Sequence, residues 1–151
     1  MIMMKSENYE QLKLENQICF PLYACARQVV NSYTPLLKPL GLTYTQYIVL
    51  MVLWESDCVT VGEIGRRLYL DNGTLTPLLK KLEKQGLIER RRCSEDERVV
   101  KISLTQEGWE MREAAKDIPA QMGSCSALDE QDAKTLYMLL YKLLGDFEGK
   151  V

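Results

Sequence analysis

Apolar side chains recur at helical spacing along most of this 151-residue chain. After Thr43 they occupy positions i, i+3, i+4 and i+7, and Thr43 and Gln46 form a capping box. This pattern predicts an amphipathic helix that ends near Asp57. Thr60 and Glu63 form a second capping box, which predicts the start of a short helix.

Helical spacing also predicts an earlier helix over 16–33, followed by a connector that contains Pro35, Pro39 and Gly41. Pro21 is an awkward member of this helix. A proline inside a helix removes one backbone hydrogen bond and bends the helix, unless it lies in the first turn.

In the middle of the chain the spacing of apolar residues changes from that of a helix to that of strands. Asp71, Asn72 and Gly73 are a compact turn and cap signal, and Gly86 is the expected end of the helix that follows. The apolar stripe of that helix consists of Leu75, Leu78, Leu79 and Leu82. Residues 87–92 and 98–104 then alternate and predict two strands joined by a polar turn.

Two further helices are predicted, one from near Thr105 with a break or bend at Pro119, and one over 129–148 with a strong apolar stripe. The fold class expected from this order is mainly α with a small β-hairpin wing, a winged helix–turn–helix. We expect an N-terminal helical segment (1–42), the winged helix–turn–helix region (43–104) and C-terminal helices (105–151).

The composition is most informative about the chemistry that it excludes. The chain contains no histidine, so a Ser-His-Asp triad, a Cys-His pair and an imidazole metal site are excluded within it. The five cysteines form no C-x-x-C pair and fit neither a zinc site nor a disulfide framework. We therefore expect no metal and no cofactor. The chain has no long apolar run and no signal-peptide core, so a cytoplasmic protein without a membrane partner is expected.

Charge is distributed unevenly along the chain. Residues 60–104 carry ten lysines and arginines against seven acidic residues, whereas the remainder carries nine against fourteen. A basic middle favours binding to a polyanion, although ordinary surface variation would give the same imbalance.

The order of helix, turn, helix and basic hairpin favours DNA as that polyanion. In a winged helix–turn–helix the second helix enters the major groove, and arginines of the hairpin meet phosphates or a narrow minor groove. The alternative is a helical domain with a solvated lysine face and a surface hairpin. The candidate DNA-binding residues are Asn72, Thr74, Thr76, Pro77, Lys80, Lys81, Arg90, Arg91, Arg92, Asp96 and Arg98.

The terminal helices over 16–33 and 129–148 carry more apolar surface than a small winged module could cover. Pairing them across a two-fold axis would bury that surface and place two recognition helices about one DNA turn apart. A homodimer on a pseudo-palindromic operator in double-stranded DNA is therefore expected, with the terminal segments as its dimerisation region.

The chain also resembles a known family over about 14–105. Asp96, Arg98, Leu104 and Thr105 resemble the wing of MarR repressors in general. The block around Cys19, together with Tyr33 and Tyr44, resembles the organic-hydroperoxide-sensing branch of that family, usually called OhrR.

This resemblance implies a repressor that binds its operator when reduced and has an organic hydroperoxide as inducer. It implies that the peroxide oxidises Cys19 to a sulfenic acid and that Tyr33 and Tyr44 hydrogen-bond the reactive sulfur. It also implies that Cys125 forms an intersubunit disulfide with Cys19, as in the two-cysteine members. Cys25 and Cys58 are expected to be small buried apolar residues, and the role of Cys93 stays open.

Two other functions remain as alternatives. One is a MarR-type regulator that responds to a small aromatic ligand or to a general oxidative signal. The other is a thiol peroxidase, which the basic helix and hairpin disfavour because they would have no purpose in it. We therefore expect a regulator and not an enzyme.

Overall fold

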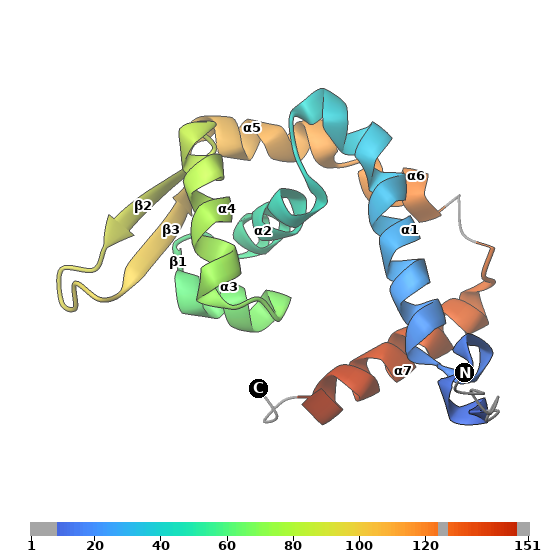
Figure 1. Ribbon diagram of the computed structural model, residues 1–151. Coiled ribbons are helices and arrows are strands. Elements are labelled where there is room, and N and C mark those ends of the chain that lie inside the picture. The colour runs from blue at the N-terminus through green and yellow to red at the C-terminus, as the bar shows by residue number, and fades with distance from the viewer. Residues whose placement is uncertain (1–8, 124–126, 148–151) are drawn as a thin grey trace, which may run out of the picture. The chain divides into compact units, whose positions relative to one another are not determined.

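The computed structural model describes residues 9–123 and 127–147 (Figure 1). The chain divides into two compact units, one ending at Lys116 and one beginning at Asp117. The elements of the first unit are two short 3-10 turns (Glu10–Leu12 and Leu14–Asn16), α1 (Cys19–Leu37), η3 (Lys38–Leu40), α2 (Tyr44–Glu55), β1 (Val59–Thr60), α3 (Val61–Leu68), α4 (Asn72–Lys84), β2 (Ile88–Arg92), β3 (Val100–Leu104) and α5 (Gln106–Ala115). The second unit contains α6 (Ile118–Gly123) and α7 (Glu130–Phe147).

The predicted mainly helical fold with a small wing is confirmed. The boundaries after residues 42 and 104 were expected to separate the DNA-binding region from the dimerisation segments, and this division stays a prediction. No single helix in the described ranges is long and apolar enough to cross a bilayer. Only when Cys19–Leu40 and Tyr44–Glu55 are taken together are they long and apolar enough to do so, and the two helices are bent by 73° relative to each other.

Both predicted capping boxes are present. The Thr43 amide donates to Gln46 Oε1 at 2.9 Å, and the Gln46 amide donates back to Thr43 Oγ1 at 3.3 Å. The Thr60 amide donates to Glu63 Oε2 at 2.6 Å, and this bond is the main reason that the pKa of the Glu63 carboxyl lies below its usual value. These reciprocal bonds satisfy amides that a helix start leaves unpaired, so they fix where α2 and α3 begin.

The turn between α3 and α4 lies earlier than predicted. Asp71 is the N-cap of α4 and accepts from the Thr74 amide at 2.7 Å, so Asn72 and Gly73 belong to the first helical turn. The chain reverses at Tyr69, which caps α3 with a left-handed φ of 55°. Gly86 follows α4 with a φ of +75°, as its predicted place at the helix end requires.

The prolines also stand differently from the expectation. α1 begins at Cys19 rather than at 16, which places Pro21 in the first turn, where a missing amide hydrogen costs no helical bond. The helix continues through Pro35 to Leu37. α5 ends at Ala115 and α6 begins at Ile118, so the break expected at Pro119 falls just before it.

The wing is a three-stranded sheet rather than a simple hairpin. β2 and β3 pair antiparallel as predicted, and β1 adds to the other edge of β3 with Val59 opposite Ile102. A two-residue strand is too short to show alternation in a sequence. The second strand begins at Val100 rather than at 98, which leaves Arg98 in the turn. Figure 1 shows β2 and β3 extending beyond the helices of this unit.

The core of the first unit lies among α2, α3, α4 and the sheet. All four leucines of the predicted α4 stripe are buried: Leu75, Leu78, Leu79 and Leu82. The buried side chains of the same unit also include Leu50, Leu53, Ile64, Ile88 and Ile102. At Gly108 in α5, a Cβ atom would lie 2.2 Å from the backbone oxygen of Leu87, so the close approach of α5 to the start of β2 requires glycine.

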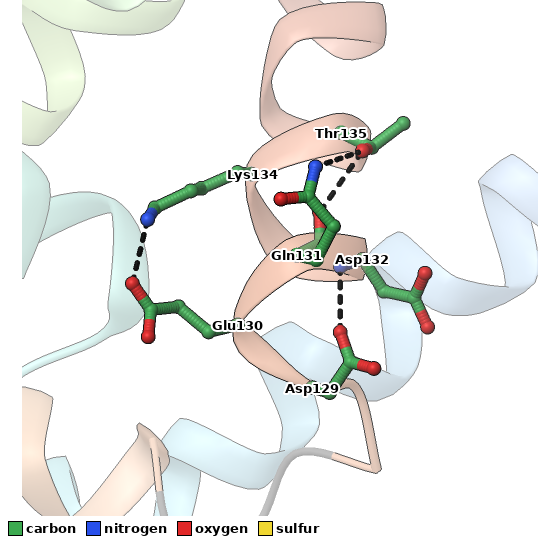
Figure 2. Close-up of polar contacts among 6 residues, drawn as sticks. All are labelled: Asp129, Glu130, Gln131, Asp132, Lys134 and Thr135. Atoms are coloured by element: carbon green, nitrogen blue, oxygen red, sulfur yellow. Dashed lines mark hydrogen bonds and ion pairs between the residues drawn. The ribbon is translucent and has the colours of Figure 1, made fainter.

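α7 begins as its sequence predicts, with Asp129 accepting from the Asp132 amide at 2.8 Å (Figure 2). Lys134 pairs with Glu130 at 2.6 Å one turn later, which adds a local contact on the helix surface (Figure 2). The large apolar and aromatic side chains of α7 are exposed in the single chain: Leu136, Tyr137, Met138, Leu139, Tyr141 and Leu143.

Candidate nucleic-acid interface and thiol site

The outer face of α4 is the first candidate interface. The leucine stripe faces the core, and this orientation turns the remaining positions outward. All the α4 residues predicted to contact DNA are exposed: Asn72, Thr74, Thr76, Pro77, Lys80 and Lys81. Lys80 and Lys81 take part in no ion pair within the described residues, so their charges are available to a phosphate.

The four wing arginines differ in how far their charges are already used. Arg90 Nε lies 2.8 Å from Glu83 Oε2, and its side chain is only 29% exposed, so it ties β2 to α4. Arg91 pairs with Glu89 on its own strand at 2.7 Å. Arg92 is exposed and has no ion pair in the part of the chain that the structure describes.

Arg98 lies in the turn at the tip of the wing. Its backbone amide and its Nε both donate to Asp96 Oδ1, at 3.0 and 3.2 Å. The Arg98 side chain is nonetheless 92% exposed. Asp96 therefore holds the turn and orients Arg98, while the guanidinium keeps donors that a phosphate can accept.

An aromatic cluster lies where α1 meets α2. The rings of Tyr33 and Tyr44, both half-buried, are 4.8 Å apart between centroids, and Tyr47 lies 5.8 Å from Tyr33 and 6.4 Å from Tyr44. Burial, and secondarily the neighbouring Tyr33, raises the pKa of Tyr44 and of Tyr47 above the usual value. Both phenols therefore stay protonated at neutral pH and can act as hydrogen-bond donors.

Sequence reasoning did not single out Tyr47 as part of this cluster. Its position in the apolar stripe of α2 identified it only as a core residue, and it is indeed 3% exposed. Its ring also lies 6.3 Å from that of Trp54, whose Nε1 donates to the backbone oxygen of Gly108 at 3.0 Å.

The structure does not bring Cys19 to these tyrosines within one chain. Cys19 is the first residue of α1 and is exposed, whereas Tyr33 lies fourteen residues later on the same helix. A rise of 1.5 Å per residue separates them by about 21 Å. Tyr33 and Tyr44 thus lie against each other but not against Cys19 of their own chain, and the expected hydrogen bonds to its sulfur stay a prediction.

The other cysteines are placed as follows. Cys25 and Cys58 are exposed, so the expectation that they are buried is wrong for the single chain, because neither faces the core of the first unit. Cys93 follows β2 in the wing turn, where hydrogen bonds from the backbone of Glu95 and Asp96 lower the pKa of its thiol. Cys125 lies outside the described residues.

Apolar side chains are exposed around Cys19. Ile18 and Phe20 flank it with 88% and 44% of their surface exposed. Together with Leu14 and Pro21 they line an open hollow of about 930 Å³ at the start of α1. An unpartnered apolar surface of this kind is typical of a binding or subunit interface. Among the described residues, no cluster of three or more acidic or cysteine side chains could hold a metal ion.

Comparison with known proteins gives consistent results. A family model described as transcriptional regulator SarA/Rot matches residues 31–115. The chain is 50% identical over 142 residues to the organic hydroperoxide resistance transcriptional regulator of Bacillus subtilis strain 168. The matched region covers 94% of this chain and 97% of that relative.

Solved structures give the same picture. Reduced AbfR bound to DNA is 39% identical, with a TM-score of 0.76 and coverage of 91% of this chain and 96% of that one. AbfR is a protein of Staphylococcus epidermidis. Its disulfide form is also 39% identical, with a TM-score of 0.64 and coverage of 89% and 95%.

Proposed function

The chain belongs to the SarA/Rot family of transcriptional regulators, and we propose that it is a DNA-binding repressor that senses organic hydroperoxides through Cys19. It is a MarR-type regulator and not an enzyme. The cytoplasm, where thiols are kept reduced, is the compartment in which such a sensor works.

The observation that carries DNA binding is the outer face of α4 next to the wing. The face combines hydroxyl and amide groups with two lysines that have no ion pair in the part of the chain that the structure describes, and these groups match base edges and phosphates. Arg91, Arg92 and Arg98 extend the contact along the wing, with Asp96 orienting Arg98. Arg90 serves the interface indirectly, because its ion pair with Glu83 joins the wing to α4.

A homodimer is the form in which the chain binds DNA. Its apolar side chains on α1 and α7 are exposed, and a second copy of the chain would cover them. Segments 1–42 and 105–151 are the proposed dimerisation parts. Two copies of α4 then read the two halves of a pseudo-palindromic operator.

The dimer also accounts for the separation of Cys19 from the tyrosine pair. Since Cys19 lies about 21 Å along α1 from Tyr33 of its own chain, the pair is proposed to receive Cys19 of the partner subunit. The hydroxyl groups of Tyr33 and Tyr44 would donate hydrogen bonds to the thiolate in the reduced state.

Oxidation then replaces the thiolate that accepts those bonds by a neutral, larger sulfenic acid. The thiolate of Cys19 attacks one peroxide oxygen, the O–O bond breaks, and the alcohol leaves after taking up a proton, so that the sulfur becomes a sulfenic acid. The thiol of Cys125 is proposed to attack this sulfur, releasing water and forming an intersubunit disulfide. Each step changes the packing at the α1–α2 corner, and the operator is released.

The test is operator binding by the protein on its own upstream DNA, measured reduced, after stoichiometric organic hydroperoxide, and again after dithiothreitol. Loss of binding on oxidation and recovery on reduction are expected. Cys125→Ser should remove the crosslinked dimer from a non-reducing gel but keep the oxidation of Cys19. Tight binding that ignores hydroperoxide would reject peroxide sensing and favour a regulator of a different ligand.

A further inference from the structure

Gln46 is the one buried polar side chain among the described residues, with 5% of its surface exposed. Its two amide atoms have separate tasks. Oε1 accepts the Thr43 amide at 2.9 Å and so closes the capping box of α2. Nε2 donates to Gln85 Oε1 at 3.1 Å, across thirty-nine residues of sequence. The cap alone does not require this second bond, since a glutamate at this position would close the box equally well.

Gln85 occupies a corresponding position at the end of α4. It is the C-cap residue, and its backbone amide donates to the Lys81 oxygen at 3.0 Å. Its side-chain Nε2 donates to the backbone oxygen of Gly41 at 2.9 Å. The end of the recognition helix is thereby bonded to Gly41 in the connector between α1 and α2 and to Gln46 inside α2.

This connector joins the two elements that carry the tyrosine pair. Tyr33 lies on α1 shortly before it, and Tyr44 is the first residue of α2, two residues before Gln46. Tyr47 follows Gln46 directly and contacts both tyrosines. A displacement of the α1–α2 corner on oxidation must therefore either move Gln85 with it or break the two side-chain bonds of Gln85.

We propose that Gln46 and Gln85 are positioning residues that transmit the state of the tyrosine pair to the recognition helix α4. The inference rests on the proposed function, because it names how the sensing corner controls the DNA-binding element. A bond donated from a buried amide holds its partner in place, since breaking it leaves the amide without a partner in a poorly solvated place. The α1–α2 corner and the end of α4 are thus held together in the reduced and in the oxidised protein. A displacement of the corner therefore displaces the end of α4 as well.

Two variants separate this link from the stability of the helices. Gln46→Glu retains an acceptor for the Thr43 amide but cannot donate to Gln85. Gln85→Ala removes the bonds to Gln46 and to Gly41 at an exposed position. The matched control is Glu63→Gln, the reverse exchange in the capping box of α3, where the side chain bonds only within its own cap in the described chain.

The measured quantity is the ratio of operator dissociation constants after and before hydroperoxide treatment. In parallel, the rate of Cys19 oxidation is measured as the rate at which its thiol becomes resistant to alkylation. Gln46→Glu and Gln85→Ala should each lower this ratio about fivefold to tenfold, while Cys19 is oxidised at the wild-type rate. The double variant should lower it no further than Gln85→Ala does, because the bond that Gln46→Glu breaks is already absent in Gln85→Ala. Glu63→Gln should keep the wild-type ratio.

The outcomes separate the link from the function on which it rests. A wild-type ratio in both variants would overturn the proposed link, as would an equal drop in Glu63→Gln, because it would mean a general loosening of the unit. Slower oxidation of Cys19 in the variants would place the two residues at the sensor rather than between sensor and α4, and would also overturn it. If the wild-type protein itself keeps its operator after oxidation, the proposed function fails, and the link is rejected with it.

Discussion

Two arginines of β2 form a matched pair for testing the wing. Arg90 and Arg92 stand two residues apart in one strand, so their side chains leave the same face of the sheet. Arg90 is paired with Glu83 at 2.8 Å, whereas Arg92 is exposed and has no ion pair within the described residues. Replacing each by alanine removes the same charge, but only Arg92 is free to neutralise a phosphate.

The expected magnitude follows from counterion release. Each phosphate that a cation neutralises adds about 0.9 to the slope of log affinity against log salt, and a homodimer carries Arg92 twice. Arg92→Ala should therefore reduce the slope by about 1.8. When salt rises fourfold, the operator affinity of the wild type should then fall by a factor about twelve times larger than that of the variant. Arg90→Ala should leave the slope within about half a unit. It should lower the free energy of unfolding by about 0.5–1 kcal/mol, because the ion pair with Glu83 is partly solvated.

The assay is a fluorescence-anisotropy titration of labelled operator DNA with reduced protein, repeated at several salt concentrations with dithiothreitol present. Denaturant unfolding at a fixed protein concentration gives the stability of each variant. An equal reduction of the slope by Arg90→Ala and Arg92→Ala would refute the distinction between a paired and a free arginine. An unchanged slope in Arg92→Ala would refute the placement of the wing on the DNA backbone.

Further predictions concern the thiol, the core and the tyrosines. Cys19→Ser should bind the operator as the reduced wild type does and should not be released by hydroperoxide; release in an operator titration would assign sensing to another cysteine. Gly108→Ala should lower the free energy of unfolding by about 2–3 kcal/mol, because its Cβ would lie 2.2 Å from a backbone oxygen. Gly62→Ala, which meets only ordinary contacts, should change it by at most about 1 kcal/mol, and equal effects in denaturant unfolding would contradict the packing argument. The raised pKa values of Tyr44 and Tyr47 stabilise the fold at neutral pH, and this contribution should be lost as pH rises above about 10 and through their folded values. Unfolding free energies that stay constant across that range, while tyrosinate absorbance rises, would contradict it.

The local signals in the sequence were sufficient for most of the helices. A capping box needs only Thr43 and Gln46, three residues apart, and the left-handed end of α4 needs only Gly86. Such signals work because the groups that satisfy the backbone lie within one turn of it. The outward face of α4 was predictable for the same reason, since the inward leucines determine it by helical spacing.

One error came from a contact between distant parts of the chain. β1 became a strand only by pairing with β3, more than forty residues later, so its two residues carried no pattern of their own. The turn and cap signal predicted at Asp71, Asn72 and Gly73 proved to be the cap alone, because Asp71 caps α4 and the two residues after it lie in the first helical turn. Pro21 could not be judged until the start of α1 was known.

The sequence by itself determined the order of elements, the exposed face of α4, and the residue types available for thiol and DNA chemistry, because these depend on local spacing and composition. Only the tertiary structure decided which of these groups meet. It paired Arg90 with Glu83, left Arg92 without an ion pair among the described residues, set Tyr33 against Tyr44 far from Cys19 of the same chain, and bonded Gln46 to Gln85. Side-chain contacts between separate elements depend on how those elements pack, and local spacing carries no record of that packing.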